Sequence, residues 1–345
     1  MRPTPYVTVD PAVLDRNIAA TQAFGADRGI AVRPHAKTHK SVEVARRQLA
    51  AGAVGLTVAT LGEAEVFADL LAAHDRDILV AYPVFPDVDR LRALAARVRV
   101  VIGVDGLAGV EAAAAAGVAV SVEVDPGLRR TGVAPVDAGP LAAAVRDRGV
   151  EVVGVFAFPG HGYGAGDAAA RAAADEARAL RIAGDSLAAA GVDAPVRSGG
   201  CTPTFAHTDA GVVTELRPGV TVFYDAQQLA LGVATLDQVA LTIVATVVSD
   251  AVTGQVVLDA GAKVLGMDRP AYVDGHGVLP DFPAARIERV WEHHGVVTIP
   301  PGTPAPAVGE RVRVIPNHVC ATVNLVDEIV VGDEVWPVSA RGRNT

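Results

Sequence analysis

The 345-residue chain has little cysteine, and no stretch of it is apolar for long enough to cross a membrane. Its two cysteines, Cys201 and Cys320, cannot form a disulfide framework, so a reducing compartment suits the chain. The first ten residues lack the apolar run of a signal peptide. Apolar runs elsewhere are short and are interrupted by glycine and charged residues. We therefore expect a soluble, cytoplasmic protein with no membrane partner.

Positive charge is also scarce. Lysine and arginine number 30 against 39 acidic residues, which gives a formal net charge of -9. This balance argues against nucleic acid as a partner, although a local cationic site can still bind a small anion. Half of the residues are apolar, which is ample for a large core, and the length exceeds that of most single domains. One large domain with a smaller module is the natural expectation.

Short β-rich runs alternate with Ala-, Leu- and Arg-rich helical patterns from residue 10 to residue 235. The expected strands are 30–34, 54–58, 78–82, 98–104, 118–124, 150–156, 194–197 and 220–224. The expected helices include 41–51, 61–73, 88–97, 107–116, 136–148 and 168–190. Several helices are followed by a glycine suited to a helix C-terminus, namely Gly52, Gly117, Gly149 and Gly191. This order predicts an α/β fold, a (β/α)8 TIM barrel over residues 10–235.

Two features qualify the barrel prediction. An open doubly wound sheet is the alternative, but no G-x-G-x-x-G sequence follows the first strand. After residue 236 the pattern changes to strands at 239–248, 255–258, 286–291, 296–299, 311–315 and 329–338, with turn clusters between them. We expect residues 236–345 to form a C-terminal β-rich domain, to which residues 1–9 add a strand.

A basic segment, R-P-H-A-K-T-H-K at 33–40, follows the first expected strand and precedes a helical pattern that begins at Ser41. This places Lys37 at the carboxyl end of a barrel strand, where parallel α/β folds carry their chemistry. A lysine there can form a Schiff base if burial and neighbouring cations, such as Arg33, lower its pKa. The simpler alternative is a basic loop that binds an anion.

Two further segments carry candidate ligands. His318 and Cys320 are two residues apart, so on a strand they would face the same way, and an imidazole with a thiolate suits Zn2+. Alternatively, Cys320 is a small buried apolar residue and His318 an ordinary loop histidine. After the seventh expected strand, R-S-G-G-C-T-P-T at 197–204 offers backbone N–H groups and hydroxyls for a phosphate. The phosphate candidates are Ser198, Gly199, Gly200 and Thr202. Tyr224 is a candidate for a phosphate or ring contact, or for core packing.

The basic segment resembles the lysine motif of the D-serine dehydratase and D-threonine aldolase family, which are fold-type III pyridoxal phosphate (PLP) enzymes with an alanine racemase-like barrel. The resemblance implies that Lys37, and not Lys40, carries the cofactor. It also implies a Zn2+ site at P-N-H-V-C, residues 316–320, with Mn2+ or another divalent metal as the alternative. Dehydratases of the family carry His-x-Cys at this place, whereas the aldolases usually show His-x-Asp.

Two other motifs extend the resemblance. D-P-G-L-R-R-T-G at 125–132 is similar to the D-x-G-x-x-R-x-G motif of these barrels, which implies that Arg130 lies near the phenolic oxygen of the cofactor or near the substrate carboxylate. Tyr163 matches a family tyrosine that lies against the ring nitrogen of the cofactor. The family holds the PLP phosphate at the Ser-Gly-Gly turn. Arg130 as a surface arginine, and His161 as an ordinary turn residue, are the plainer alternatives.

The resemblance implies a lyase that acts on small D-3-hydroxy amino acids, most directly a D-serine dehydratase that forms pyruvate and ammonia. In the first alternative, a D-threonine aldolase cleaves the Cα–Cβ bond to glycine and an aldehyde. A PLP-carrier protein, a metal hydrolase barrel without PLP and an amino-acid racemase are further alternatives. Related enzymes usually work as homodimers, so a homodimer is expected.

Overall fold

The computed structural model describes residues 2–83 and 87–345, and internal contacts divide the chain into two compact units. The unit that we call the barrel unit consists of Ala19–Lys37, Val42–Gly219 and Gly342–Thr345. The other, which we call the sheet unit, consists of Met1–Ile18, Thr38–Ser41 and Val220–Arg341. Helix α1 (Pro11–Ala26) contributes to both units.

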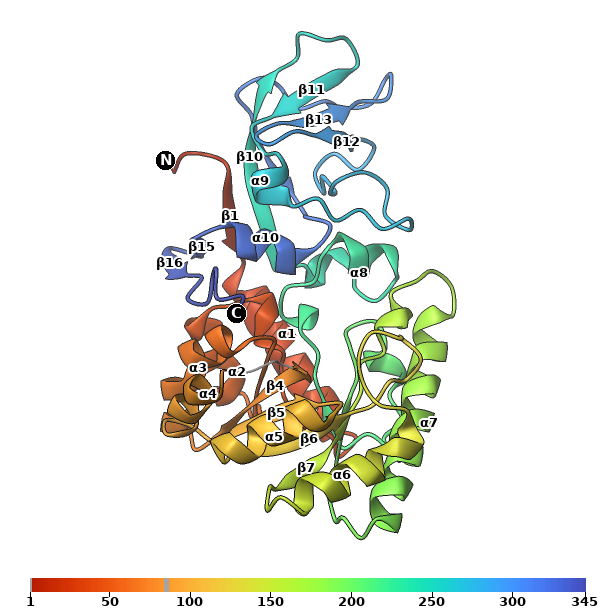
Figure 1. The fold of residues 1–345 in the computed structure, drawn as a ribbon. Coiled ribbons are helices and arrows are strands. Elements are labelled where there is room, and N and C mark those ends of the chain that lie inside the picture. Colours follow the sequence, from red (N-terminus) through yellow and green to blue (C-terminus); the bar gives the residue numbers. More distant parts are fainter. Residues whose placement is uncertain (1, 84–86) are drawn as a thin grey trace. The chain divides into compact units, whose positions relative to one another are not determined.

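The barrel unit contains eight parallel strands surrounded by helices (Figure 1). In spatial order the strands are β2 (Ala31–Val32), β9 (Glu215–Leu216), β8 (Val196–Gly199), β7 (Val152–Phe156), β6 (Ala119–Glu123), β5 (Val100–Val104), β4 (Asp77–Pro83) and β3 (Gly55–Val58). The two ends of this row meet through the bonds Val54 N to Val32 O, 3.0 Å, and Thr57 N to Pro34 O, 2.9 Å. The predicted (β/α)8 architecture is confirmed.

The helices of the barrel follow from local sequence signals. They are α2 (Val42–Ala50), α3 (Leu61–Ala73), α4 (Val88–Ala95), α5 (Leu107–Ala116), α6 (Ala138–Arg146) and α7 (Ala168–Ala189). Gly117 ends α5 with φ of 70°, and Gly52, Gly149 and Gly191 also have positive φ, as a helix C-terminus favours. Strands β5 and β6 are buried along their whole length, because helices cover them outside and side chains fill the barrel inside.

One expected strand was wrong. Val220–Val222 forms a 3-10 helix, η5, and the eighth barrel strand is the two-residue β9, Glu215–Leu216. The apolar run at 220–224 is buried for another reason: it belongs to the sheet unit, where Val220, Val222 and Phe223 are part of the core. Strand β9 was not predicted, because the Glu215 carboxylate points into a polar barrel interior and the strand therefore has no apolar run.

The sheet unit is built around an eight-stranded sheet. Its strands run β12 (Arg286–Val290), β13 (Gly295–Thr298), β11 (Gln255–Leu258), β10 (Leu241–Ser249), β1 (Tyr6–Val9), β15 (Glu328–Val331) and β16 (Glu334–Pro337), and β14 (Arg311–Val314) pairs with β10. The expected β-rich character and the strand at the start of the chain are confirmed. The single strand expected at 329–338 is instead the hairpin β15–β16, which turns at Gly332 with φ of 59°.

Three short helices also belong to the sheet unit: α8 (Ala226–Ala230), α9 (Ala262–Leu265) and α10 (Val319–Leu325). Residues 220–235 join this unit because the backbone of α8 bonds to the segment before α10, through Ala226 N to Pro316 O at 3.0 Å and Gln227 N to Asn317 O at 3.2 Å. The contact division therefore falls earlier than residue 235. Domain limits at residues 10–235 and 236–345 stay a prediction.

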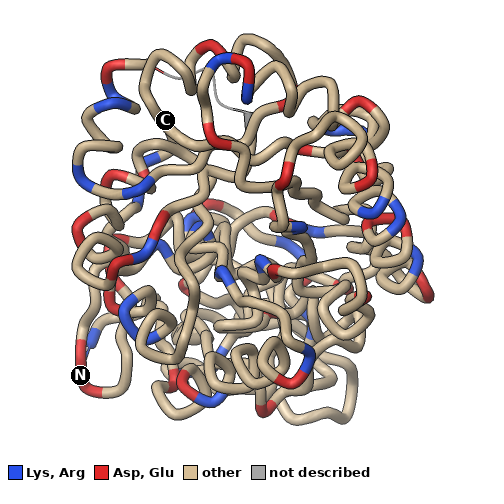
Figure 2. The backbone as a smooth tube through the Cα atoms, turned by 90° about the horizontal axis from the view of Figure 1, so that it is seen from below, with Lys and Arg blue, Asp and Glu red and all other residues tan. Residues whose placement is uncertain are grey.

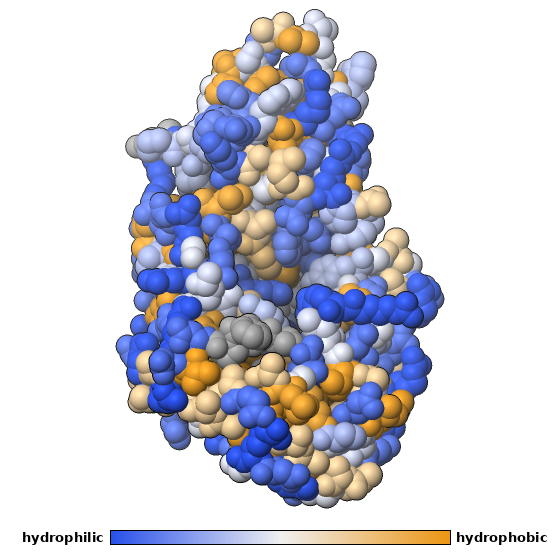
Figure 3. All heavy atoms as spheres, viewed as in Figure 1, coloured by the Kyte–Doolittle hydropathy of each residue, from blue (hydrophilic) through white to orange (hydrophobic). Residues whose placement is uncertain are grey.

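Two views show where charged and apolar residues lie. Acidic and basic residues are interspersed along the outer turns of the chain (Figure 2). On the face seen in Figure 3, apolar residues form small groups among polar ones. Across residues 2–83 and 87–345, no helix combines the length and the apolar character that crossing a bilayer requires.

Candidate functional site

Lys37 lies in the short 3-10 helix η1 (Ala36–Thr38), which follows β2 at the carboxyl end of the barrel. A cavity of about 290 Å³, which we call the Lys37 pocket, opens there. Its lining comes from strand β4 and from the segments after five other strands, and consists of His35, Lys37, Ala59, Ala81, Tyr82, Arg130, Thr131, Phe158 and Arg217. This is the end of the barrel at which (β/α)8 proteins place their active sites.

The Lys37 pocket is cationic. The Nζ atom of Lys37 lies 5.6 Å from the ring centroid of Phe158, and the guanidinium carbon of Arg130 lies 4.9 Å from the same centroid. Arg217 brings a third positive charge. Burial raises the pKa of the Glu123 carboxyl, although the charges of Arg130 and Arg217 act to lower it. The raised pKa reduces the negative charge with which Glu123 can neutralise the two arginines. The pocket therefore favours an anionic ligand, and it brings together Lys37 and Arg130.

Arg217 was not predicted. Its guanidinium is buried, and burial lowers its pKa although three carboxylates oppose that effect. Its Nε donates to Ser198 Oγ at 2.8 Å, Nη2 donates to Ala157 O, and its guanidinium carbon lies 5.1 Å from the Phe156 ring centroid. The signal that could have revealed it is the Arg-Pro-Gly sequence directly after β9, which marks another strand end.

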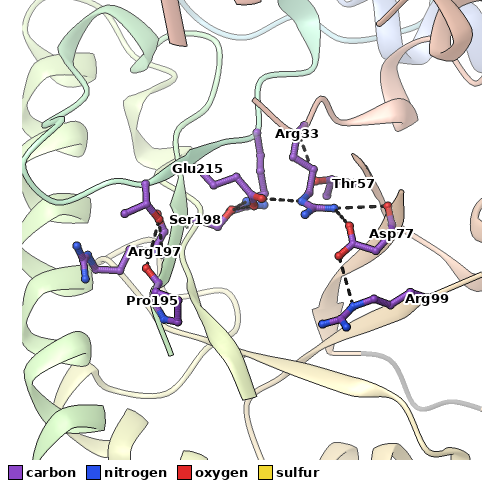
Figure 4. Close-up of polar contacts among 10 residues, drawn as sticks. Arg33, Thr57, Asp77, Arg99, Pro195, Arg197, Ser198 and Glu215 are labelled. Carbon is purple, nitrogen blue, oxygen red and sulfur yellow. Dashed lines mark hydrogen bonds and ion pairs between the residues drawn. The ribbon is translucent and has the colours of Figure 1, made fainter. Parts of the chain in front are cut away.

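A polar network fills the barrel interior (Figure 4). Arg33 bonds to Asp77 and donates Nε to Glu215 Oε2 at 2.8 Å, and Ser198 Oγ donates to Glu215 Oε1 at 2.6 Å. Burial would lower the pKa of Arg33, but the carboxylates of Glu215 and Asp77 outweigh it and raise that pKa. These residues line a second cavity of about 380 Å³.

Two expectations are affected by this network. Arg33 was expected to act on Lys37, but two carboxylates neutralise it, and it lines the second cavity instead of the Lys37 pocket. The cations that share the pocket with Lys37 are Arg130 and Arg217. Ser198 was a phosphate candidate, yet its hydroxyl already donates to Glu215 and accepts from Arg217.

The glycine turn after β8 is also occupied by a protein group. The N–H of Gly200 lies 2.9 Å from Oε1 and 3.0 Å from Oε2 of Glu176, a buried residue of α7. Burial raises the pKa of Glu176 to about 8. A Cβ at Gly199 would lie 2.6 Å from Glu176 Oε1, which explains the glycine. Thr202, two positions after Gly200 in the sequence, is buried. Phosphate binding by Gly199, Gly200 and Thr202 stays a prediction.

The two candidate tyrosines are not among the described residues that line the Lys37 pocket. Tyr163 follows η3 (Gly160–Gly162) and is half-buried. Tyr224 belongs to the sheet unit, has φ of 51°, and has a pKa raised by burial. His161 Nε2 lies 3.4 Å from Asp175 Oδ2, which gives it a partner within the barrel unit.

His318 and Cys320 would face the same way on a strand, but the structure has a helix at this place. His318 is the N-cap residue of α10, with extended φ of -139° and ψ of 108°, and Cys320 lies in the first turn of that helix. Val319, Thr322 and Val323 are fully buried at helical spacing, so packing overrides the β preference of these branched residues. The helix start nevertheless brings the thiol close enough to the imidazole for Cys320 to raise the pKa of His318.

The His318–Cys320 pair has polar neighbours in the sheet unit. His318 Nδ1 lies 3.3 Å from Asp225 Oδ2, and Cys320 Sγ lies 3.3 Å from Thr38 Oγ1. Burial would lower the pKa of His318, but Cys320 and Asp225 together raise it to about 11. Within the described residues, no cluster of three or more His, Cys, Asp or Glu side chains is arranged to hold a metal. Imidazole and thiolate are nonetheless a donor set that suits Zn2+.

Comparison with known folds first defines the class. Residues 9–227 match the family model described as alanine racemase, N-terminal domain, and residues 240–332 match that of a putative serine dehydratase domain. Alanine racemase from Bacillus anthracis superposes with a TM-score of 0.70 over 97% of each chain at 16% identity, a likeness of fold alone. The barrel and the sheet unit thus have the fold of the alanine racemase class.

Nearer relatives narrow the class. D-threo-3-hydroxyaspartate dehydratase from Delftia sp. is 35% identical over 92% of this chain and 91% of its own, and its structure superposes with a TM-score of 0.88 over 98% and 97% of the two chains. D-threonine aldolase from Arthrobacter sp. is 34% identical over 98% of this chain and 93% of its own. A cysteine-to-alanine variant of the dehydratase was solved in a metal-free form.

The chain belongs to the D-serine dehydratase and D-threonine aldolase family of fold-type III enzymes. Membership makes it a PLP-dependent lyase, as the resemblance of its lysine motif implied.

Proposed function

We propose that the protein is a PLP- and metal-dependent dehydratase of D-3-hydroxy amino acids, with D-serine as the first candidate substrate. The observation that carries this proposal is the cationic pocket around Lys37 at the carboxyl end of the barrel. PLP is anionic, and its aldehyde requires an amine within the same cavity. Lys37 provides the amine, while Arg130 and Arg217 provide the positive charge that the cofactor and the substrate carboxylate need.

The chemistry of each group follows from its type. When bound, PLP withdraws electrons from the α-carbon of the amino acid that it carries. The Nζ atom of Lys37 holds the cofactor at rest and, once displaced by substrate, removes the α-proton. Arg130 pairs with the substrate carboxylate or the phenolic oxygen and so orients the α-proton toward the lysine. Gly199, Gly200 and Thr202 remain the proposed phosphate ligands, with Tyr163 at the ring nitrogen and Tyr224 at the phosphate or ring.

His318 and Cys320 would hold a divalent metal, for which Zn2+ fits the donor set best. When bound, the metal makes the β-hydroxyl of the substrate a better leaving group. Two protein ligands leave coordination positions for water and substrate. The metal-free structure of a cysteine-to-alanine variant of D-threo-3-hydroxyaspartate dehydratase supports a cysteine as a metal ligand. The product of dehydration then hydrolyses to a 2-oxo acid and ammonia, which are pyruvate and ammonia for D-serine.

An incubation with D-threonine, with and without added divalent metal, tests the proposal. Mass analysis should show 2-oxobutyrate and ammonia, and D-serine and D-threo-3-hydroxyaspartate are then compared as substrates. Lys37→Ala should abolish turnover, since it removes both the anchor and the base. Full activity of that variant, or activity that survives complete metal loss, would show that the assigned roles are wrong.

The second candidate is retro-aldol cleavage, which the 34% identity to a D-threonine aldolase favours. Glycine and acetaldehyde from D-threonine would establish it. The appearance of L-threonine would indicate a racemase, PLP bound without turnover a carrier, and a colourless protein a metal hydrolase. A homodimer in the cytoplasm remains our prediction, and light scattering tests its first part.

A further inference from the structure

Asp225 contacts His318 within the sheet unit, and Asp225 is completely buried. Oδ2 accepts the backbone N–H of Val319 at 3.1 Å and faces His318 Nδ1 at 3.3 Å, while Oδ1 accepts the backbone N–H of Gln228 at 3.1 Å. Both oxygens therefore have protein donors. One oxygen holds both the imidazole of His318 and the backbone of the next residue, which begins α10.

This contact determines which nitrogen of His318 is available. A carboxylate can only accept, so Nδ1 must carry a proton to bond with Asp225. The neutral imidazole then has its lone pair on Nε2. A histidine that ligates a metal commonly donates its other N–H to a carboxylate in this way, and the carboxylate fixes both tautomer and ring orientation.

Cys320 has a corresponding neighbour. Its Sγ lies 3.3 Å from the hydroxyl oxygen of Thr38, which is fully buried. The thiol donates this bond when protonated, and the hydroxyl donates it when the sulfur is a thiolate. The segment that carries Thr38 makes a second contact with α10, since Lys40 donates Nζ to Asn324 Oδ1 at 2.8 Å.

We propose that Asp225 and Thr38 are positioning residues for the metal at His318 and Cys320: Asp225 holds the imidazole with Nε2 free to bind the metal, and Thr38 stabilises the thiolate by donating its hydroxyl hydrogen. This inference rests on the proposed function, because it assumes a metal at that pair. Sequence reasoning gave neither residue this role, since Asp225 is 93 positions and Thr38 is 282 positions from its partner.

The test is zinc affinity of the PLP-loaded protein, measured by competition with a chromophoric chelator. Asp225→Asn should weaken zinc binding about 10- to 100-fold, because the amide NH2 favours the tautomer with hydrogen on Nε2. Thr38→Val should weaken it less, and Thr38→Ser should restore it by returning the hydroxyl. Cobalt loading adds a spectroscopic readout, since the thiolate-to-cobalt absorption should weaken in Thr38→Val and return in Thr38→Ser.

The matched control is Asp87→Asn, which also removes a carboxylate from a helix N-cap. Asp87 accepts the backbone N–H groups of Asp89 and Arg90 at the start of α4, in the barrel unit. This variant should bind zinc as the unmodified protein does. Circular dichroism and PLP content verify that each variant is folded. If Asp225→Asn does not fold, the comparison of Thr38→Val with Thr38→Ser tests the proposal.

The outcomes separate this inference from the proposed function. If Asp225→Asn and Thr38→Val are folded and bind zinc with unchanged affinity, the positioning roles are wrong while the metal site stands. If the unmodified protein binds no zinc, or if His318→Ala with Cys320→Ala leaves its zinc content unchanged, the metal site itself is wrong and the positioning roles fall with it.

Discussion

The buried carboxyl of Glu176 makes stability depend on pH. Its pKa rises to about 8 on burial, against an ordinary value of 4.5. Between these values the folded state holds the proton and the unfolded state does not. Rising pH therefore favours the unfolded state over this range, which is the reverse of the behaviour of a salt-bridged carboxylate.

Glu176→Gln should remove this dependence while keeping an oxygen for the Gly200 N–H. We expect the variant to gain stability over the unmodified protein by up to ~1.4 kcal/mol for each pH unit between about 5 and 8. Urea unfolding at pH 5.5, 7 and 8.5 measures the difference. Glu111→Gln, at an exposed ion pair with Arg148, is the control and should show no such trend. A constant difference for Glu176→Gln across pH would contradict the prediction.

At the scale of residues, the sequence revealed groups that sit in recognisable motifs. The motifs brought Lys37 and Arg130 to one pocket, which the structure shows. Arg217 and Asp225 were given no role from the sequence, because each acts through partners distant in the chain. Ser198 was predicted as a phosphate ligand, but its hydroxyl donates to Glu215 within a buried network that no local sequence pattern reveals.

At the scale of elements, prediction succeeded where the signal was local. Helices α3 and α5 have the predicted bounds, because apolar spacing and a following turn residue define them. Prediction failed where tertiary packing determines the secondary structure. The strand β9 has only two residues, and α10 consists largely of residues that prefer strands. In α10 the buried spacing of Val319, Thr322 and Val323 was the helical signal that was missed.

Two glycines test how elements pack. In β7 a Cβ at Gly154 would lie 2.0 Å from the backbone oxygen of Val196 in the adjacent β8, whereas a Cβ at Gly184 in α7 would meet only Arg197, at 3.7 Å or more. Gly154→Ala should destabilise the protein by ~2 kcal/mol through overpacking. Gly184→Ala should stabilise it by ~0.8 kcal/mol through helix propensity. Urea midpoints measure both, and equal shifts would contradict the predicted difference in sign.

At the scale of the whole molecule, the candidate cofactor and metal groups belong to different units. The residues of the Lys37 pocket are all in the barrel unit, and His318 and Cys320 are in the sheet unit. The sequence separated a barrel from a β-rich domain correctly. It could not show that the basic segment divides after Lys37, because that division depends on contacts of Thr38 and Lys40 with α10.

Removing the metal pair should therefore leave the cofactor in place. We expect His318→Ala combined with Cys320→Ala to lose its metal and most of its lyase activity, while PLP remains bound to Lys37. Elemental analysis and the absorbance of bound PLP measure the two contents separately. The reciprocal control, Lys37→Ala, should lose covalent PLP and keep its metal. Loss of PLP from the metal-pair variant would show that the two sites are not independent.

The route of the chain between the units limits how this protein can be recombined. The chain passes from one unit to the other after residues 18, 37, 41, 219 and 341. No single cut can separate the units, so neither can be exchanged between relatives as one continuous gene segment. A chimera joined at residue 219 would combine a barrel from one parent with a sheet unit whose first strand and Thr38–Ser41 segment come from that same parent. Exchange between relatives must therefore preserve pairs such as Thr38 with Cys320, which lie on opposite sides of the junction in the sequence.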